Sequence, residues 1–191
     1  MVQSVYSVEK LKAAVGGFAK GNRYNVLIVP PAVLVGSAVP GQLTYLCESV
    51  SLPTKGLASN PQDIYSTPRE IPYRETFTES ALSFYIDDDF AVKNFFDEWQ
   101  GNIVNPNTGN VNYWHNFTGK LIITRVENDS QTLAGGPKKY VIELLEAYPS
   151  VVGEIALGHA QGTDALRLSV TFKYRRWNNI SPSAADIEDD F

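Results

Sequence analysis

The chain has 191 residues, 43% of them hydrophobic, and a formal net charge of −5. This length and hydrophobic content are typical of one globular domain, residues 1–191, and exclude a disordered chain. The negative charge argues against general nucleic-acid binding, and the single cysteine, Cys47, excludes an internal disulfide. No apolar run reaches the roughly 20 residues of a membrane span, and residues 1–21 lack the hydrophobic region of a signal peptide, so we expect a protein made and kept in a cytoplasm.

The N-terminal part of the chain predicts one helix followed by two strands. Residues 7–20 carry apolar side chains three and four positions apart, which indicates a short amphipathic helix. Residues 23–29 and 43–50 alternate between apolar and polar positions, which predicts two strands. The two strands are close enough in sequence to pair as a hairpin. Cys47 is interpreted as a small buried hydrophobic residue of the second strand.

A proline-rich region extends from residue 53 to residue 75. It contains four prolines but also Tyr65 and Tyr73, which makes it too aromatic for a plain linker. A loop this long inside a compact domain usually has a function or lacks order. We therefore expect residues 63–73 to form a long protruding hairpin or loop.

A strand at residues 77–86 is followed by the clearest helix signal in the chain. Asp87, Asp88 and Asp89 are interpreted as capping the free N–H groups at the start of this helix; a metal site is the weaker alternative for these three carboxylates. Gly101 is expected to end it. The helix presents one apolar stripe, formed by Val92, Phe95, Phe96 and Trp99.

The C-terminal half predicts long strands. A polar loop at residues 102–116 precedes a strand at 119–127 and a loop at 128–137. A strand at 140–146 is expected to break near Pro149, which marks a turn or a sheet edge, and a further apolar run follows at residues 151–157.

The strongest alternation of the chain lies at residues 164–177 and predicts one strand of fourteen residues. Residues 178–191 are acidic and expected to be a mobile tail.

About eight strands and one strong helix favour a mainly β fold. We expect two packed antiparallel sheets or a partly closed β-barrel, with one flanking α-helix and a long protruding hairpin or loop. The two histidines, His115 and His159, have no Cys, Asp or Glu at ligand spacing, and no nucleophile elbow, zinc motif or dinucleotide turn occurs. We therefore expect no enzymatic activity, no catalytic or metal-binding residues and no cofactor.

The order of these motifs resembles the tail tube proteins of contractile-tailed bacteriophages. The resemblance covers about residues 22–177, while the loop at 102–116 and the acidic tail depart from it. It rests on the segments Asn22–Ile28, Leu43–Pro53, Ile71–Tyr73, Phe77–Phe84, Phe95–Gln100 and Tyr140–Trp177.

The resemblance implies a structural protein of the virion tail, assembled in the host cytoplasm. Hexameric rings would stack into a hollow tube through which DNA passes without sequence-specific binding. Sheath, baseplate and tape measure proteins would be its partners, with no membrane. Three alternatives stay open: a baseplate protein that initiates the tube, the tube of a type VI secretion or phage-tail-like injection system, and a monomeric ligand-binding β-barrel.

The residues themselves also give a reason to expect assembly. A long amphipathic strand and a proline-rich protrusion leave edges and apolar surface that a monomer should hide. We also expect a lumen that is not basic and carries net negative charge, because each Lys or Arg that neutralises a phosphate would retain DNA. Lys173, Arg175 and Arg176 should therefore lie at a subunit contact or on the outer surface, paired with acids of a neighbour. The predicted inter-subunit contacts are Ile64, Tyr65, Arg69, Ile71, Tyr73, Lys173, Arg175 and Arg176.

Overall fold

The computed structural model describes residues 20–34, 40–62, 69–125, 140–158 and 165–181. The helix predicted at residues 7–20 lies outside these ranges except for Lys20. The loop at 128–137 and the tail from residue 182 onward also lie outside them.

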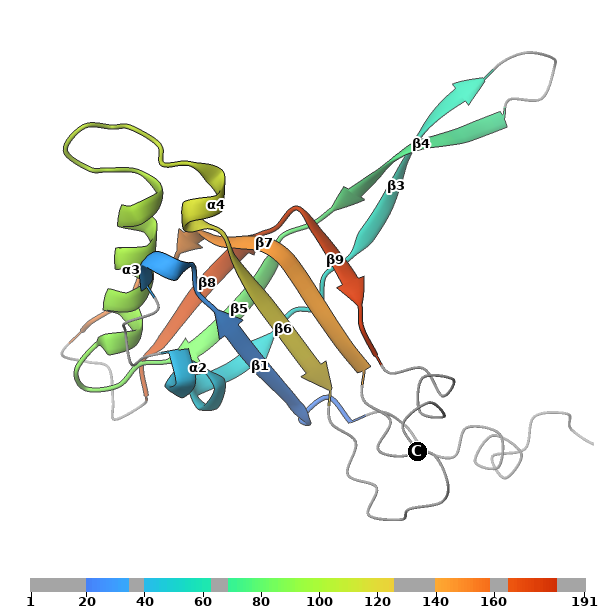
Figure 1. The fold of residues 1–191 in the computed structure, drawn as a ribbon. Helices are drawn as coiled ribbons and strands as arrows, with labels where there is room; N and C mark the ends of the chain where they lie inside the picture. The colour runs from blue at the N-terminus through green and yellow to red at the C-terminus, as the bar shows by residue number, and fades with distance from the viewer. Residues whose placement is uncertain (1–19, 35–39, 63–68, 126–139, 159–164, 182–191) are drawn as a thin grey trace, which may run out of the picture.

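Nine β-strands of the described residues form one seven-stranded sheet and one two-stranded sheet, and all pairs are antiparallel (Figure 1). The order in the larger sheet is β1-β6-β7-β8-β5-β2, and β9 also pairs with β7. The strands are β1 (Tyr24–Val29), β2 (Cys47–Val50), β3 (Lys55–Gln62), β4 (Arg69–Phe77), β5 (Ser80–Tyr85), β6 (Gly119–Arg125), β7 (Tyr140–Val152), β8 (Arg167–Lys173) and β9 (Arg176–Asn179).

The long strand β7 joins two layers of the larger sheet. Its first half pairs with β6 and β9, and its second half, from Tyr148, pairs with β8. Between the halves, Glu146 has a φ of 56°, a left-handed conformation that bends the strand. Two packed antiparallel layers are therefore confirmed, while the outermost strands β1 and β2 do not pair and the sheet does not close into a barrel.

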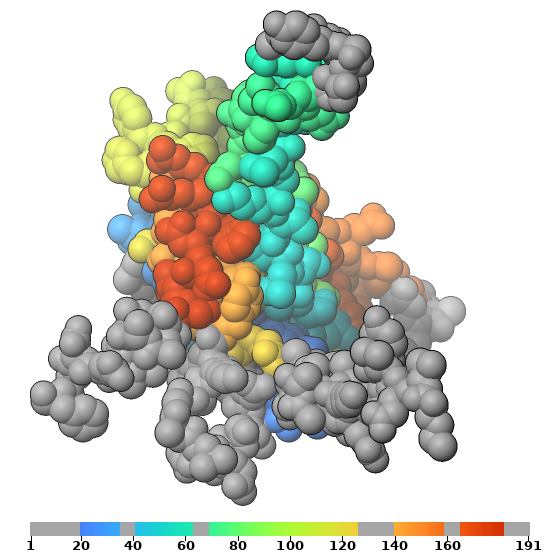
Figure 2. Space-filling view, turned by 90° about the vertical axis from the view of Figure 1, so that its right-hand side faces the viewer, coloured from blue at the N-terminus to red at the C-terminus, as the bar shows by residue number. Residues whose placement is uncertain are grey.

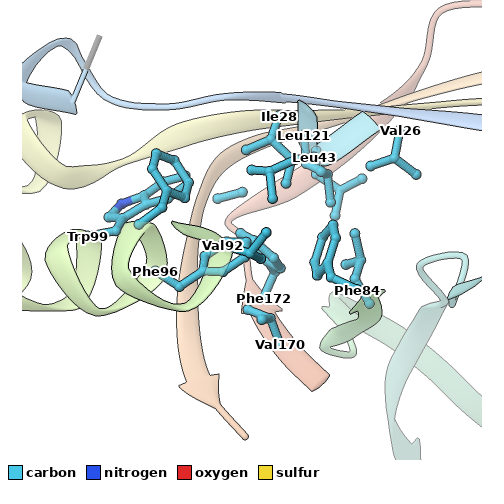
Figure 3. Packing of buried hydrophobic residues seen from close by; sticks show 14 of the residues in the cluster. Val26, Ile28, Leu43, Phe84, Val92, Phe96, Trp99, Leu121, Val170 and Phe172 are labelled. Atoms are coloured by element: carbon cyan, nitrogen blue, oxygen red, sulfur yellow. The ribbon is translucent and has the colours of Figure 1, made fainter. Parts of the chain in front are cut away.

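The core lies between the two layers, on the sides of the strands that the alternation predicted to be buried. Figure 3 shows side chains from both layers pointing toward one another. The buried residues are Val26 and Ile28 of β1, Leu121 and Ile123 of β6, Ile142 and Leu144 of β7, Leu82 and Phe84 of β5, and Leu168, Val170 and Phe172 of β8.

The helix α3 (Ala91–Ile103) packs its predicted stripe onto this core, and all four residues of the stripe are buried (Figure 3). Of the three predicted capping carboxylates, only Asp87 bonds the start of the helix, accepting a hydrogen bond from the N–H of Ala91 at 3.0 Å, and Phe90 takes the N-cap position. Gly101 does not end the helix, because the chain stays helical until Ile103. Two shorter helices, α2 (Pro40–Leu46) and α4 (Trp114–Phe117), and a 3₁₀ turn η1 (Ala32–Leu34) complete the described elements.

The predicted strand at 43–50 is half wrong, because its first part is the helix α2. Leu43 is 1% exposed whereas Tyr45 is 87% exposed, because residues two apart point to opposite sides of a helix, whereas in a strand they would share a face. The predicted hairpin with residues 23–29 is also wrong, since β1 pairs with β6 and β2 pairs with β5. Cys47 is only half-buried, and desolvation raises the pKa of its thiol to about 11.

Two predicted strand boundaries in the C-terminal part are wrong as well. β7 continues through Pro149, so the predicted break of the strand is wrong. Pro149 pairs with β8 on one side and has no described strand partner on the other, so its interpretation as a marker of a sheet edge is confirmed. The predicted strand at 164–177 is divided into β8 and β9, which pair with β7 in different layers. Similarly, the strand predicted at 77–86 begins only at Ser80.

Candidate assembly surface

The arm, defined as the hairpin of β3 and β4, packs least on the rest of the chain. Its strands pair only with each other, over eight residue pairs. Apart from Ala58 and Phe77, its described residues are exposed, and Figure 2 shows it projecting past the rest of the domain. An isolated two-stranded hairpin is only marginally stable in water. A surface of another molecule would therefore stabilise the arm.

The predicted protrusion is confirmed, but its predicted bounds, 63–73, are too short. The hairpin runs from Lys55 to Phe77. Pro61 and Pro72 lie inside its strands, where they hid the strand pattern from sequence analysis. A two-stranded sheet has only edge strands, and edges tolerate a residue without an N–H donor.

Three of the predicted contact residues lie on the described part of the arm. Arg69, Ile71 and Tyr73 are all exposed on β4, Tyr73 by 61%. Ile64 and Tyr65 lie outside the described residues. A contact role for all five stays a prediction.

The other three predicted contact residues lie near the base of the arm. Lys173 places its Nζ 3.1 Å from Glu79, two residues after β4, and Arg175 lies 2.8 Å from Glu146. Arg176 is exposed at the start of β9. The acids were expected from a neighbouring subunit, whereas both of these ion pairs form within one chain.

Glu146 connects three parts of the fold at the bend of β7. Its carboxylate accepts hydrogen bonds from Arg175 at 2.8 Å and from the Trp114 Nε1 of α4 at 2.5 Å. These two hydrogen bonds, with the positive charges of Arg175 and Arg176, hold the pKa of Glu146 below its ordinary value of 4.5. No local sequence pattern indicates this role, because it depends on a bend in the strand.

Replacing Glu146 with glutamine should lower the stability of the domain at neutral pH but not in acid. A depressed folded-state pKa means that the charged carboxylate stabilises the fold above pH of about 4.5, and that this contribution is lost as the pH falls through the folded pKa. Thermal unfolding of both proteins from pH 7 to pH 3 should show a gap in melting temperature that narrows as the pH falls through the lowered pKa of Glu146. Glu98→Gln, on the exposed face of α3, is the matched control and should show no such closing gap.

An aromatic cavity of about 250 Å³ lies at the base of the arm. Its walls come from four separate segments, so sequence analysis did not detect it. Within the cavity wall, the rings of Trp114 and Tyr148 are 5.7 Å apart and meet edge to face. The lining residues are Phe77, Thr78, Glu79, Trp114, Tyr148, Lys173 and Tyr174.

The outward faces of the two layers differ in polarity. The outward face of β2, β5 and β8, here named the polar face, carries Ser49, Ala81, Ser83, Tyr85, Arg167, Ser169, Thr171 and Lys173. The outward face of β1, β6 and the first half of β7, here named the apolar face, carries Leu27, Val29, Ile122, Val141 and Leu145, beside Asn25, Thr124 and the ion pair of Lys120 with Glu143 at 3.2 Å. Leu27 is 46% exposed, so the apolar face is open to solvent in one copy.

Charges on the polar face are paired. Glu48 lies 2.8 Å from Arg167 and accepts a hydrogen bond from the hydroxyl of Tyr85 at 3.0 Å. Desolvation acts to raise the pKa of Glu48, but the hydrogen bonds from Tyr85 and Arg167 outweigh it and lower this pKa. With the pair of Lys173 and Glu79, the positive charges of this face are balanced.

The described residues hold few features of a binding or catalytic site. They contain no group of three or more His, Cys, Asp or Glu side chains placed to hold a metal, and none of their helices is long and apolar enough to cross a membrane. A cavity of about 630 Å³ opens between the start of β1 and β2. It is lined partly by charged residues, Arg23, Glu48 and Arg125 among them, unlike the apolar cavity of the ligand-binding alternative.

Comparison with known structures places this fold among proteins of contractile injection systems. The tube-terminating cap of the anti-feeding prophage is 14% identical, with 95% of this chain and all of that chain covered and a TM-score of 0.62. The sheath/tube terminator of the extracellular contractile injection system PVC is 14% identical, with coverages of 87% and 99% and a TM-score of 0.60. A chain of the anti-feeding prophage baseplate is 10% identical, with coverages of 86% and 97% and a TM-score of 0.57. At these identities, the likeness establishes the fold alone.

The sequence establishes the family. The family model of the phage tail tube protein matches residues 19–180, so the chain belongs to the phage tail tube protein family. No curated protein matches the sequence. The chain is thus a structural component of a tail, as the ordered motifs predicted.

Proposed function

We propose that six copies of this chain form a ring and that the rings stack into a hollow tail tube. The arm is the observation that carries this proposal. It has eight residue pairs and almost no buried side chain, and its ring contact with the rest of the described domain is at its base, where Phe77 lies 6.1 Å from Tyr174. A hairpin of this kind is stabilised by docking on a neighbouring copy, and head-to-tail contacts of identical copies generate rings and filaments.

The two outward faces support an orientation of the chain in the ring. A water-filled channel favours polar groups on its wall, and an exposed apolar face favours burial. We therefore place the polar face on the lumen and the apolar face away from it. Lys173 then faces the lumen beside Glu79, which differs from the expectation that it lies outside, while Arg176 lies on the other layer and faces away.

DNA would pass along this wall during ejection without sequence-specific binding. Positively charged side chains on the channel wall bind DNA only if they are free to replace the counterions on its phosphates. Arg167 and Lys173 are already paired with Glu48 and Glu79, which supports a lumen that is not basic. The expected net negative charge of the lumen stays a prediction.

The proposal includes the partners and the place of assembly. Sheath, baseplate and tape measure proteins would contact the tube, and assembly would occur in the host cytoplasm without enzymatic activity of this chain. The resemblance to a tube-terminating cap and to a baseplate chain also fits a role at one end of the tube. The alternative functions are a tube in a phage-tail-like injection system and a tube in a type VI secretion system, and the proposed ring and stack would apply to both.

Sedimentation of the purified chain tests the proposal. One copy has a mass of 21.1 kDa, and we expect species of about six times this mass and larger ones that grow with concentration. A single 21.1 kDa species over the whole concentration range would contradict the proposed function.

A further inference from the structure

The two faces of the arm carry different charges. Residues that pair across β3 and β4 share a face, and residues two apart along a strand share it too. Lys55, Glu75 and the pair of Pro61 with Glu70 therefore lie on one face of the arm. Lys55 and Glu75 form an ion pair at 2.6 Å, and Glu70 accepts a hydrogen bond from the Ser59 hydroxyl at 2.9 Å. Both acidic residues of the described arm therefore lie on this face, and both have partners within the arm.

The opposite face carries Arg69 and Arg74, and is here named the basic face of the arm. Arg74 lies opposite Ala58, Arg69 lies opposite Gln62, and Ile71 lies between the two arginines on β4. Both arginines are exposed, and neither forms an ion pair with another described residue. Within the described part of the chain, this face thus presents two positive charges without an ion-pair partner, next to apolar surface.

At the far end of the domain lies a group of negative charges that form no ion pair with another residue the structure describes. Asp88, Asp89 and Glu154 are exposed there, and together with Asp87 they are here named the acidic end. Backbone hydrogen bonds fix both segments to the start of β8: Ile86 donates to Leu166 at 3.0 Å and Gly153 donates to Ser169 at 2.7 Å.

Basic residues near the acidic end do not neutralise it. Lys93, in the first turn of α3, is paired with Asp97 of the same helix at 2.5 Å. Arg167, at the start of β8, is paired with Glu48 at 2.8 Å. Among the described residues, the acidic end therefore has no ion-pair partner, like the basic face of the arm.

The two surfaces lie at opposite ends of β5, as Figure 1 shows. β5 begins three residues after the arm and ends two residues before Asp87. Its six residues span about 20 Å, and the eight residues of β3 extend the arm by about 26 Å. An arm at one end of a copy is therefore long enough to reach the opposite end of a copy stacked on it.

We propose that the basic face of the arm binds the acidic end of a second copy, so that complementary charge sets the head-to-tail order of the stack. This inference rests on the proposed function and names the contact that assembly uses. Complementary charges raise association rates and exclude wrong orientations, and both effects weaken as salt screens them. Arg69 and Arg74 are then specificity residues of assembly, while Ile71 adds buried apolar area.

Charge reversal tests the contact in two full-length variants, Arg69→Glu/Arg74→Glu and Asp88→Lys/Asp89→Lys. Asp87 is left unchanged because it caps α3. Each variant alone should assemble only at concentrations at least about tenfold above wild type, because like charges then meet at the contact. An equimolar mixture should assemble like wild type, since alternating copies restore opposite charges at every contact.

A matched pair of milder variants separates this face from the arm as a whole. Arg74→Gln and Lys55→Gln each remove one positive charge from the same hairpin, on opposite faces. Sedimentation should show weakened assembly for Arg74→Gln and wild-type assembly for Lys55→Gln, with unchanged melting temperatures for both.

The outcomes distinguish this contact from the proposed function. If the wild type and both charge-reversed variants assemble equally well, the proposed contact is wrong and the proposed tube function still stands. Two failing variants whose mixture also fails would overturn the pairing between these two surfaces. A wild-type chain that stays monomeric would overturn the proposed function and this contact with it.

Discussion

Replacing Trp99 with alanine should lower the free energy of unfolding by about 3–5 kcal/mol. The Trp99 side chain is 1% exposed and contacts the rings of Phe95 and Phe172 at centroid distances of 5.8 and 6.1 Å. Its ring also lies over Gly119, where an added Cβ would approach it to 3.1 Å. Truncation would leave a large cavity between α3 and both layers (Figure 3).

A lost hydrogen bond adds to this effect. The Trp99 Nε1 donates to the buried carbonyl oxygen of Phe117 at 2.7 Å, and an unsatisfied buried acceptor costs about 1–3 kcal/mol. Thermal unfolding of the purified variant measures the loss. Tyr45→Ala on α2, where the ring is 87% exposed, is the control and should leave the melting temperature almost unchanged. Equal melting temperatures for Trp99→Ala and wild type would show that the stripe of α3 does not stabilise the core.

Deleting residues 60–68 should abolish assembly while leaving the domain folded. The deletion joins Ser59 to Arg69 and leaves three residues between Ser59 and its partner Pro72, a common length for a hairpin loop. Within the described chain the removed residues contact no core residue, so no core packing is lost. An interface of standard size buries about 1,600 Å², and losing an arm that supplies a large share of it removes most of the binding energy.

Two measurements on the same sample separate folding from assembly in this deletion. Its melting temperature should match that of the wild-type monomer, and its sedimentation should show monomers only. Tubes of normal length would refute an inter-subunit role for the arm. A second variant keeps the length of the arm but has glycine and serine at all nine positions 60–68. It should assemble as poorly as the deletion, which would attribute the effect to the side chains of the arm.

The buried sides of the strands were predictable because period-two alternation depends only on local geometry. Val26 and Ile28, and likewise Leu168 and Phe172, are buried as the pattern requires. The stripe of α3 was predictable for the same reason, with a period of 3.6 residues. These patterns also sufficed to identify the family.

Pairing and strand ends were not predictable, because they depend on residues far apart in sequence. Tyr140–Val152 stays one strand through Pro149 only because β8 and β6 pair with its two halves in different layers. Leu43 and Tyr45 are apolar residues two positions apart, which predicted one face of a strand, but in the helix α2 they point to opposite sides and only Leu43 is buried.

The candidate site was predicted in outline and missed in detail. Exposed Tyr73 and Ile71 pointed to an assembly arm, but the separation of its charges into two faces follows from the pairing of β3 with β4. Glu146 and the aromatic cavity were missed, because a positive φ and a cavity between four segments leave no local pattern in the sequence.

Electron cryo-microscopy of the purified full chain tests the central claim most directly. The account predicts stacked rings with sixfold symmetry and a continuous lumen, in which the polar face of β2, β5 and β8 forms the inner wall and each arm contacts another copy. Monomers without ring order, or a tube whose inner wall is the apolar face of β1 and β6, would contradict it.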